Sequence, residues 1–330
     1  MATMSEIAEK ADVSMTTVSR VLSEDVTLKI SDEKRQRVLD VAKELNYVSM
    51  RQKKKKKDRI RVGIVHWYTS ESEFTYPYFL KIRIGIEKYC SMNQIEFIRL
   101  EHEDIPVYKK SLDAVIAVGL YEQEERDYIA RLSKYTIFID NTPKPIKHDS
   151  ISFDYHQGIH DVVTYFRKLG HERIGYIGGS KYLRKVRPKT DTMKDQLGKE
   201  LLHTTGIREE WMLEGENTAE SGYLLMKQLF KGSVHPTAVF VESALMAVGT
   251  YRAINEQGQL IPEHISIIAI SDFGGEAYML PALSTLTGDI DALTESVIDR
   301  IKEVVHKPKW HPREILLPLT LEIRESCKMI

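Results

Sequence analysis

The stretch from Ile7 to Tyr47 constrains the fold more than any other part of this chain, because three helix starts lie within it or just before it. Thr3 and Glu6 form a Thr-x-x-Glu capping box, in which each side chain satisfies a backbone amide of the other residue. Ser14 and Ser31 can cap two further helices. The apolar residues that recur at helical spacing after these caps are Ile7, Ala8 and Ala11, then Val18, Val21 and Leu22, and then Val38, Leu39, Val41, Ala42 and Leu45. We therefore expect three short helices around one small core.

The second of these helices has the pattern of a DNA-reading helix. Asp12 and Val13 make a turn between the first two helices, which gives a helix-turn-helix motif. Its second helix would enter the major groove, where Met15 and Thr16 could contact base edges and Arg20 could bond a guanine through two N–H groups. The hydroxyl groups expected on phosphates are those of Ser14, Thr17 and Ser19. The alternative is a small helical bundle whose polar face is only solvated.

The charge distribution marks the same end of the chain. Residues 1–59 contain 14 lysine and arginine against 10 aspartate and glutamate residues, a balance of +4, whereas the whole chain has a net charge of -1. Residues 49–59 have no apolar periodicity and include five consecutive lysines, which could bind phosphates by releasing counterions. We therefore assign residues 1–48 to a helix-turn-helix headpiece and residues 49–59 to a basic linker or hinge.

From Ile60 onward, apolar runs of strand length alternate with amphipathic stretches of helix length. The expected strands are 61–67, 95–100, 114–118, 136–139, 151–153, 174–177, 238–241 and 265–270, and the expected helices are 78–92, 122–133, 157–169, 193–202, 220–230 and 245–257. This alternation predicts parallel sheets, with too many strands for one sheet of ordinary width. We therefore expect two interleaved α/β subdomains over residues 60–330, with ligands at the carboxyl ends of their strands.

Composition argues against several classes of function. The chain has 330 residues, of which 42% are hydrophobic, and no apolar run approaches a membrane span. Its polar N-terminus lacks the leader of an exported protein, so we expect a cytoplasmic location. Cys90 and Cys327 lack metal-ligand spacing and are expected to be buried or incidental thiols. Because no carboxylate pair, metal-spaced histidine cluster or Gly-x-Ser-x-Gly elbow stands out, we expect no enzymatic activity, no metal and no cofactor.

Residues 8–22, Ala-Glu-Lys-Ala-Asp-Val-Ser-Met-Thr-Thr-Val-Ser-Arg-Val-Leu, and residues 41–47, Val-Ala-Lys-Glu-Leu-Asn-Tyr, closely resemble the headpiece of the LacI/GalR family of bacterial sugar-responsive repressors. The resemblance implies that Met15, Thr16 and Arg20 read operator bases and that Tyr47 contacts the DNA backbone. The full set of DNA-binding candidates is Thr3, Ser5, Ser14, Met15, Thr16, Thr17, Ser19, Arg20, Ser31, Tyr47, Lys53, Lys54, Lys55, Lys56 and Lys57.

The linker departs from this family. Relatives carry a proline soon after the Asn-Tyr pair and a hinge helix whose leucine wedges into the minor groove, whereas Ser49 and Lys56 stand at these positions here. We hypothesise that electrostatic contact replaces the apolar wedge, so that the operator is bent less. A strong kink centred on the dyad in a gel-phasing assay would contradict this.

The rest of the chain also resembles the family. Its signatures match residues 154–158, 169–179, 252–254, 261–266 and 281–286 in order and spacing. The resemblance implies a periplasmic-binding-protein-like core of two subdomains joined by three crossings, with a sugar in the cleft and a dimer interface on the flank. The implied partners are operator DNA, a sugar effector and further copies of the chain, in a dimer or a tetramer. The segments that resemble the galactose or β-galactoside branch are residues 76–80 and 84–87.

The effector pocket departs from the family at four positions. Lys189 stands where relatives have an arginine that bonds sugar hydroxyls, and Asn217 stands where an aromatic residue is frequent. Ser243 begins the replacement of an Asn-Asp pair, and Asp272 is what remains of an acidic pair. These departures indicate a different ligand, or none. The other effector-binding candidates, which could stack on a sugar or only pack at the rim of the sheet, are His66, Tyr68, Tyr76 and Tyr78.

Three alternatives to a sugar-controlled repressor remain open. Some relatives answer to a phosphorylated protein partner, which would bind the flank of the core. An enzyme of sugar metabolism with a basic N-terminal domain would need a catalytic motif, and Gly178-Gly179 lacks the further glycine and lysine of a phosphate-binding loop. A sugar-binding transport protein would need an export signal. The sequence does not reveal whether an effector would release the operator or strengthen its binding.

Overall fold

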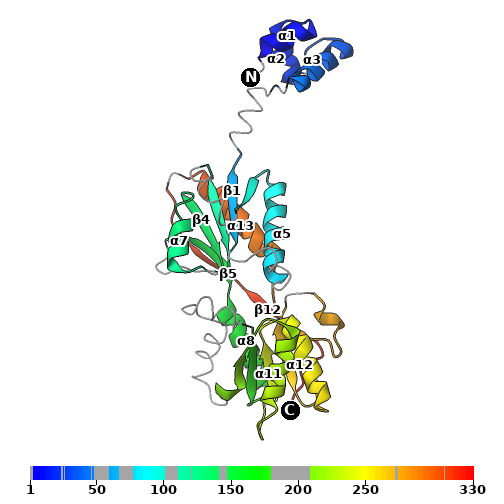
Figure 1. Cartoon of the computed structure of the whole chain (residues 1–330), viewed down its shortest axis with the longest axis vertical. Helices are drawn as coiled ribbons and strands as arrows, with labels where there is room; N and C mark the ends of the chain where they lie inside the picture. The colour runs from blue at the N-terminus through cyan, green and yellow to red at the C-terminus, as the bar shows by residue number, and fades with distance from the viewer. Residues whose placement is uncertain are drawn as a thin grey trace. The chain divides into compact units, whose positions relative to one another are not determined.

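The computed structural model describes residues 3–23, 25, 27–45, 47, 59–66, 77–100, 111–119, 121–140, 147–179, 209–271, 274–307 and 309–330. Contacts divide the chain into two compact units, residues 1–59 and 60–330 (Figure 1). The expected lysine run, Tyr68, Tyr76, Lys189, Asp272 and the expected helix 193–202 lie outside the described residues.

The first unit contains the helices α1 (Met4–Ala11), α2 (Met15–Leu22) and α3 (Asp32–Glu44). The three predicted caps are confirmed. Thr3 and Glu6 make both bonds of the capping box, and the backbone N–H of Thr17 donates to Ser14 Oγ at 3.1 Å. Ser31 caps α3 in the same way. The buried core of this unit consists of Ile7, Ala8, Ala11, Val18, Val21, Val38 and Ala42.

The expectation that Leu39 packs into this core is wrong. Leu39 is 41% exposed, whereas Val38 and Ala42 of the same helix are buried. Successive helix residues are rotated by about 100°, so position 39 lies beside the face that positions 38 and 42 direct inward.

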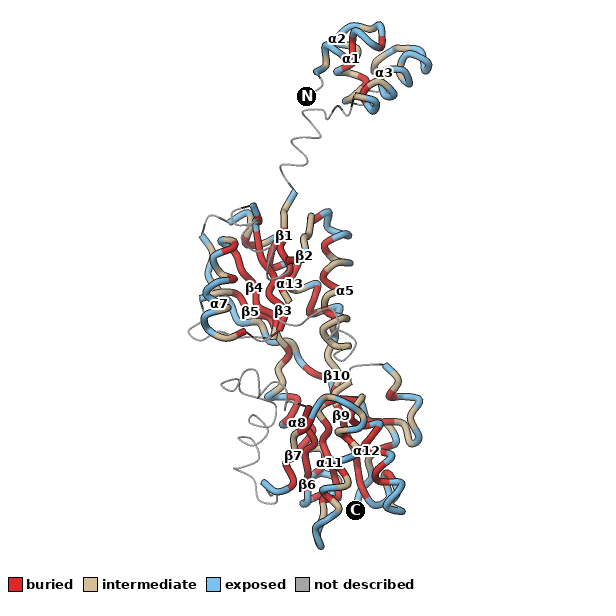
Figure 2. The backbone as a smooth tube through the Cα atoms, in the orientation of Figure 1, coloured by how far each residue is buried: buried red, intermediate tan, exposed pale blue. Residues whose placement is uncertain are grey.

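The second unit contains two six-stranded sheets in its described part. Their central strands are largely buried, as the red segments of Figure 2 show. The strands of the first sheet are β1 (Arg61–His66), β2 (Glu96–Leu100), β3 (Ala114–Val118), β4 (Tyr135–Ile139), β5 (Asp149–Phe153) and β11 (Glu314–Leu317). They follow the order β11-β5-β4-β3-β1-β2, and every pair is parallel. The helices associated with this sheet are α5 (Pro77–Met92), α7 (Gln123–Ile129) and α13 (Ile290–Val305).

The second sheet is also six-stranded and mostly parallel. Its strands are β6 (Ile174–Gly178), β7 (Met212–Glu214), β8 (Ala238–Val241), β9 (Ser266–Ile270), β10 (Ser284–Gly288) and β12 (Leu319–Glu322). They follow the order β12-β10-β9-β8-β6-β7, and only β12 runs antiparallel to its neighbour. Its helices are α8 (Tyr155–Lys168), α11 (Ala219–Leu229) and α12 (Ala244–Glu256), with short 3-10 turns at Glu209–Trp211 (η2) and Glu276–Tyr278 (η3).

The described chain passes between the two sheets three times, from β5 into α8, from β10 into α13 and from β11 into β12. These passages are in contact: the N–H of Asp154 donates to the Leu317 carbonyl at 2.8 Å, and a Cβ added at Gly288 would lie 2.6 Å from the Phe153 ring. Because β5 and β10 both run toward the passages, the carboxyl ends of the parallel strands in both sheets point there. This is the edge at which α/β sheets bind ligands.

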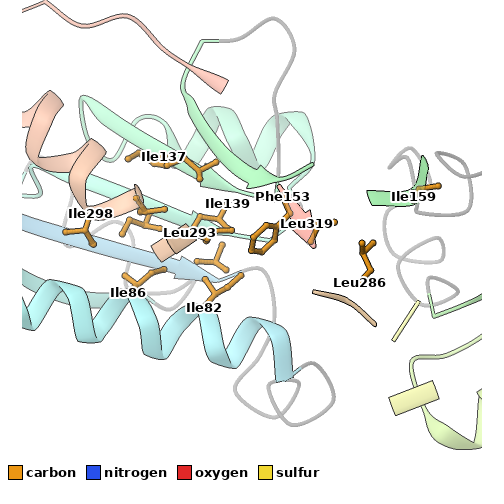
Figure 3. Packing of buried hydrophobic residues seen from close by; sticks show 14 of the residues in the cluster. Ile82, Ile86, Ile137, Ile139, Phe153, Ile159, Leu286, Leu293, Ile298 and Leu319 are labelled. Atoms are coloured by element: carbon orange, nitrogen blue, oxygen red, sulfur yellow. The ribbon is translucent and has the colours of Figure 1, made fainter. Parts of the chain in front are cut away.

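Burial of apolar side chains fixes the helices on the first sheet. Ile82 and Ile86 of α5, Leu293 of α13 and Ile137 and Ile139 of β4 are fully buried in one cluster. Figure 3 shows these side chains together, with Phe153 and Leu319 at the end of the sheet nearest the passages. The apolar stripes of the two helices therefore hold the strand ends in place.

The predicted elements hold with a few differences. Strands 114–118 and 238–241 coincide with β3 and β8. The helix predicted to reach residue 133 ends at Ile129, because Ser133 instead donates to the Asp113 carbonyl at 2.8 Å and leads into β4. The prediction has no element at β7 or after residue 270, where the structure has β10, α13, β11 and β12.

Helices α11 and α12 approach so closely that glycine is required between them. A Cβ added at Gly249 would lie 1.7 Å from the Ala219 carbonyl oxygen. We therefore expect Gly249→Ala to lower the free energy of unfolding by about 3 kcal/mol or more, because backbone atoms must move apart. Gly258→Ala is the control. Its φ of +69° disfavours alanine, but apart from the two neighbouring residues no heavy atom of the described residues lies within 4 Å of an added Cβ, so a loss of about 1 kcal/mol is expected. Equal losses in urea unfolding would contradict this account.

Candidate functional sites

The outward face of α2 carries the residues that the sequence predicted to read bases. Met15 is 55% exposed, and Thr16 and Ser19 are also exposed. Val18 and Val21 face the core of the unit and are buried. The helix is thus anchored on one side and exposes Met15, Thr16 and Ser19 on the other, as a helix that enters the major groove must.

The remaining headpiece candidates lie at helix starts or against the core. Thr3, Ser14 and Ser31 are the N-caps of α1, α2 and α3, and Ser5 is exposed in the first turn of α1. Thr17 is half-buried, and its hydroxyl lies 2.8 Å from Ser14 Oγ. Tyr47 is half-buried against the core, and its N–H donates to the Ala42 carbonyl at 2.9 Å. The cap hydroxyls are therefore already engaged by backbone amides.

Arg20 differs from the other candidates because its side chain is held by two neighbours. Its Nε donates to Asp25 Oδ2 at 2.7 Å and its Nη2 donates to Thr27 Oγ1 at 2.9 Å. The Arg20 side chain nevertheless remains 42% exposed. A cationic group is thus fixed at the C-terminal end of the outward face.

A second group of polar side chains lies at the carboxyl ends of the first sheet. His66 ends β1, Asp140 follows β4 and Tyr155 follows β5, while Tyr78 opens the helix that comes after β1. Asp140 has a φ of 58°, in the left-handed region that aspartate tolerates better than most residues. Both carboxylate oxygens of Asp140 and the Tyr78 hydroxyl are buried, and none has a well-formed hydrogen bond to another described residue.

Burial controls the ionisation of this group. It raises the pKa of the Asp140 carboxyl to about 6, and the nearby Tyr78 hydroxyl only partly opposes that rise. Burial, reinforced by the negative charge of Asp140, also raises the pKa of the Tyr78 and Tyr155 hydroxyls. The two tyrosines therefore keep their protons, and Asp140 is an acceptor that lacks a well-formed donor among the described residues.

The second sheet brings its own polar groups to its carboxyl ends. Glu242 follows β8, and its Oε2 accepts hydrogen bonds from the Tyr176 hydroxyl and from the N–H of Gly179, each at 2.7 Å. Ser243 caps α12, and its Oγ donates to Asn217 Oδ1 at 2.6 Å. Asn217 and Ser243, predicted from distant parts of the sequence, are therefore brought into contact.

The two groups act on each other electrostatically, since the charge of Glu242 contributes to the raised pKa of Tyr155. Asp140, Tyr155 and Glu242 were missing from the predicted site. A signal was present: both carboxylates come directly after a fully buried strand, where parallel strands present polar residues to a ligand. Over the described ranges, no cluster of three or more His, Cys, Asp or Glu residues could hold a metal ion, and no helix is long and apolar enough to cross a membrane.

The chain is similar to known bacterial regulators over nearly its whole length. A model of bacterial regulatory proteins of the lacI family matches residues 3–49, and a periplasmic binding protein-like domain matches residues 163–327. The chain is 30% identical to the HTH-type transcriptional repressor MelR of Bacillus subtilis (strain 168), over 99% of this chain and 98% of the relative.

Two solved structures share the fold. The lac repressor dimer bound to operator and the anti-inducer ONPF matches with a TM-score of 0.74 and 22% identity, over 99% of both chains. A LacI family regulator from Arthrobacter sp. FB24 in complex with lactose matches with a TM-score of 0.66 and 18% identity, over 81% of this chain and 99% of that one.

Proposed function

This chain belongs to the LacI family of bacterial regulatory proteins, and we propose that it is a repressor that binds a palindromic operator as a dimer under the control of a small sugar. The lacI family model and the related repressor describe regulators, and the second family model describes a binding-protein-like domain, so neither indicates an enzyme. We further propose that the protein acts in the cytoplasm on an operon for galactose or β-galactoside use. The observation that carries the proposal is the pairing of an outward polar face on α2 with buried polar groups at the carboxyl ends of both sheets.

The DNA-binding part rests on the chemistry of α2. Met15 and Thr16 offer an apolar surface and a hydroxyl to base edges, and Arg20 offers donors that suit guanine O6 and N7. The excess positive charge of residues 1–59 adds attraction that does not depend on sequence. Specificity would therefore come from α2 and much of the affinity from the basic linker.

The effector-binding part rests on Asp140 and its neighbours. A buried carboxylate that lacks a well-formed donor is a strong acceptor for sugar hydroxyl groups, and the rings of Tyr78 and Tyr155 offer apolar surface with hydroxyl groups. Asn217 and Ser243 would bond the sugar from the second sheet. Lactose, held by one structurally similar regulator, is itself a β-galactoside, which supports the same choice here.

The coupling of the two activities follows from the passages between the sheets. A ligand that bonds Asp140 on one sheet and Ser243 on the other would favour one arrangement of the subdomains over another, with the contact of Phe153 and Gly288 as a pivot. In a dimer this would alter the spacing of the two headpieces. The sign of the effect is decided by which arrangement binds the operator.

We assign the dimer contact to an exposed apolar surface on the second subdomain. Tyr278 and Leu280 are each 87% exposed, and Val248 of α12 is 42% exposed. The Tyr251 hydroxyl of α12 donates to the Pro281 carbonyl at 3.2 Å, so the segment that carries Leu280 lies beside this helix. A second copy of the chain is the occupant that a palindromic operator requires.

A fluorescence-anisotropy titration tests the proposed function. The purified full-length chain is titrated against the duplex upstream of its own gene and against a scrambled duplex, each with and without galactose and lactose. Specific binding that one sugar changes supports the proposal. Specific binding that no sugar changes would contradict sugar control and favour a protein or phosphorylated effector, and equal binding to both duplexes would contradict a sequence-specific repressor.

The lysine run gives a prediction of its own. Replacing Lys53 to Lys57 by glutamine should weaken binding to operator and scrambled duplexes alike, because the lysines contact phosphates and not bases. The slope of log K against log salt should become shallower by about 0.9 for each phosphate that the protein no longer neutralises. The control is the double variant Lys231→Gln with Lys302→Gln, which replaces two exposed lysines of the unit formed by residues 60–330. A loss confined to the operator would show that the run takes part in base recognition.

A further inference from the structure

The loop after α2 forms a closed hydrogen-bonded ring with Arg20. Asp25 Oδ2 accepts the Nε–H of Arg20 at 2.7 Å, and Thr27 Oγ1 accepts a hydrogen from Nη2 at 2.9 Å. The Thr27 hydroxyl in turn donates to Asp25 Oδ1 at 2.7 Å. Three side chains within eight residues of sequence are therefore joined in one ring, beside the face that carries Met15 and Thr16.

Asp25 is itself fixed to the backbone. Its Oδ1 accepts the N–H of Thr27 at 2.8 Å, and its own N–H donates to the Arg20 carbonyl at 3.0 Å. Hydrogen bonds from Thr27, and then from Arg20, lower the pKa of the Asp25 carboxyl to about 2. The Asp25 carboxylate therefore stays ionised at any pH at which the protein would bind DNA. Because it is itself fixed by these hydrogen bonds, it holds the Arg20 side chain in one position.

The ring leaves a defined set of donors on the arginine. A guanidinium group has five N–H bonds, and the ring uses the Nε–H and one Nη2–H. Both hydrogens of Nη1 and the second hydrogen of Nη2 remain, and Nη1 donates no hydrogen bond to another described residue. Nη1 and Nη2 are neighbouring donors on the free end of the group, which is the arrangement that guanine O6 and N7 accept.

We propose that Asp25 is a specificity-determining positioning residue, which holds Arg20 in the orientation that reads guanine end-on. This inference rests on the proposed DNA-binding function. An arginine side chain without such neighbours loses rotamer freedom when it binds a base. The ring has already restricted the rotamers of Arg20 before DNA binds. The negative charge of Asp25 also repels phosphates, so the same residue lowers affinity for DNA that lacks the matching guanine.

These two effects have opposite signs, and the test uses that difference. Binding of the full chain to the operator and to single base-pair variants of it is measured by anisotropy. Arg20→Ala identifies the base pair at which preference is lost. Asp25→Asn should then lower the preference at that pair about tenfold, while affinity for a scrambled duplex stays equal or rises. Thr27→Val removes both ring bonds of the Thr27 hydroxyl without altering charge. It should lower the preference by a smaller factor, because the bond from Arg20 Nε to Asp25 remains.

Asp40→Asn is the matched control, because Asp40 is an exposed carboxylate of the same unit that bonds Gln36 and not Arg20. It should raise affinity for all duplexes slightly and leave base preference unchanged. In the double variant of Arg20→Ala with Asp25→Asn, the loss of preference should not exceed that of Arg20→Ala alone.

The outcomes separate the positioning role from the proposed function. If Asp25→Asn leaves the preference unchanged, or weakens every duplex equally, the positioning role is overturned although the protein is still a specific repressor. If the unaltered chain binds operator and scrambled duplexes equally, both the role and the repressor function fail. Circular dichroism of each variant identifies any that lose helix content, and a loss of preference accompanied by loss of helix counts against positioning.

Discussion

Leu280→Asp is expected to convert the proposed dimer to a monomer and to weaken operator binding by about a hundredfold at the same protein concentration. Leu280 and Tyr278 expose 87% of their surface to solvent in the isolated chain, although apolar side chains of this size are usually covered. An aspartate at the centre of an apolar interface would be buried without a partner, which costs several kcal/mol. Loss of the second headpiece then removes the gain that comes from binding two half-sites together.

Sedimentation equilibrium and anisotropy on the same samples measure the two effects. Met329→Asp is the control, since Met329 is also highly exposed, at 66%, but lies at the C-terminal end of the chain. It should leave both mass and affinity unchanged. A dimer that persists in Leu280→Asp, or a monomer that binds the operator as tightly as the unaltered chain, would remove this surface from the proposed mechanism.

Local signals in the sequence predicted the headpiece almost completely, because short helices depend on local chemistry. The caps Thr3, Ser14 and Ser31 each bond a backbone amide three residues away, and such contacts can be inferred from spacing alone. Leu39 shows the limit of this reasoning. It lies only one position after the buried Val38 on the same helix, and yet it is exposed to solvent. The ring of Arg20, Asp25 and Thr27 was not predicted, because a loop without periodicity gives no indication of where its side chains point.

The core was harder to predict after residue 270. In α13, Leu293, Val297 and Ile301 recur at helical spacing and are buried. This helix could therefore have been predicted from the sequence pattern, although it was not. In contrast, β11 and β12 are four-residue strands that leave alternate residues exposed. Their partners, β5 and β10, lie more than 30 residues away in sequence. Such a pairing cannot be predicted from the residues of the strands themselves.

The proposed effector site also contains residues that could be predicted from the sequence and residues that could not. Asn217 and Ser243 were predicted from positions, and their contact at 2.6 Å joins the start of α11 to the start of α12. Asp140 was missed because a single aspartate after a strand also fits an ordinary loop. Only the fold shows that this carboxylate is buried beside Tyr78, and burial is what distinguishes a binding group from a solvated one.

Asp140→Asn is expected to abolish the response to a sugar and, at the same time, to stabilise the ligand-free protein. The carboxylate has a pKa of about 6 in the folded chain against 3.8 without burial. Its ionised form is therefore disfavoured by folding, by about 3 kcal/mol at most. This penalty is complete above pH 6 and disappears as the pH falls toward 4. The stability gained by Asp140→Asn in urea unfolding should accordingly be largest near pH 8 and vanish near pH 4.

Effector binding should favour the ionised form of Asp140, which folding disfavours. Sugar hydroxyls donate to the ionised carboxylate, so in the unaltered chain the affinity for galactose or lactose should fall as the pH drops below about 6. Asp140→Asn should bind weakly at every pH and should keep its operator affinity. Asp299→Asn, at a surface carboxylate that is 63% exposed, is the control and should change neither stability nor response. A normal sugar response in Asp140→Asn would show that the buried carboxylate is a structural group, and equal stability of both proteins at pH 8 and pH 4 would show that burial imposes no penalty on it.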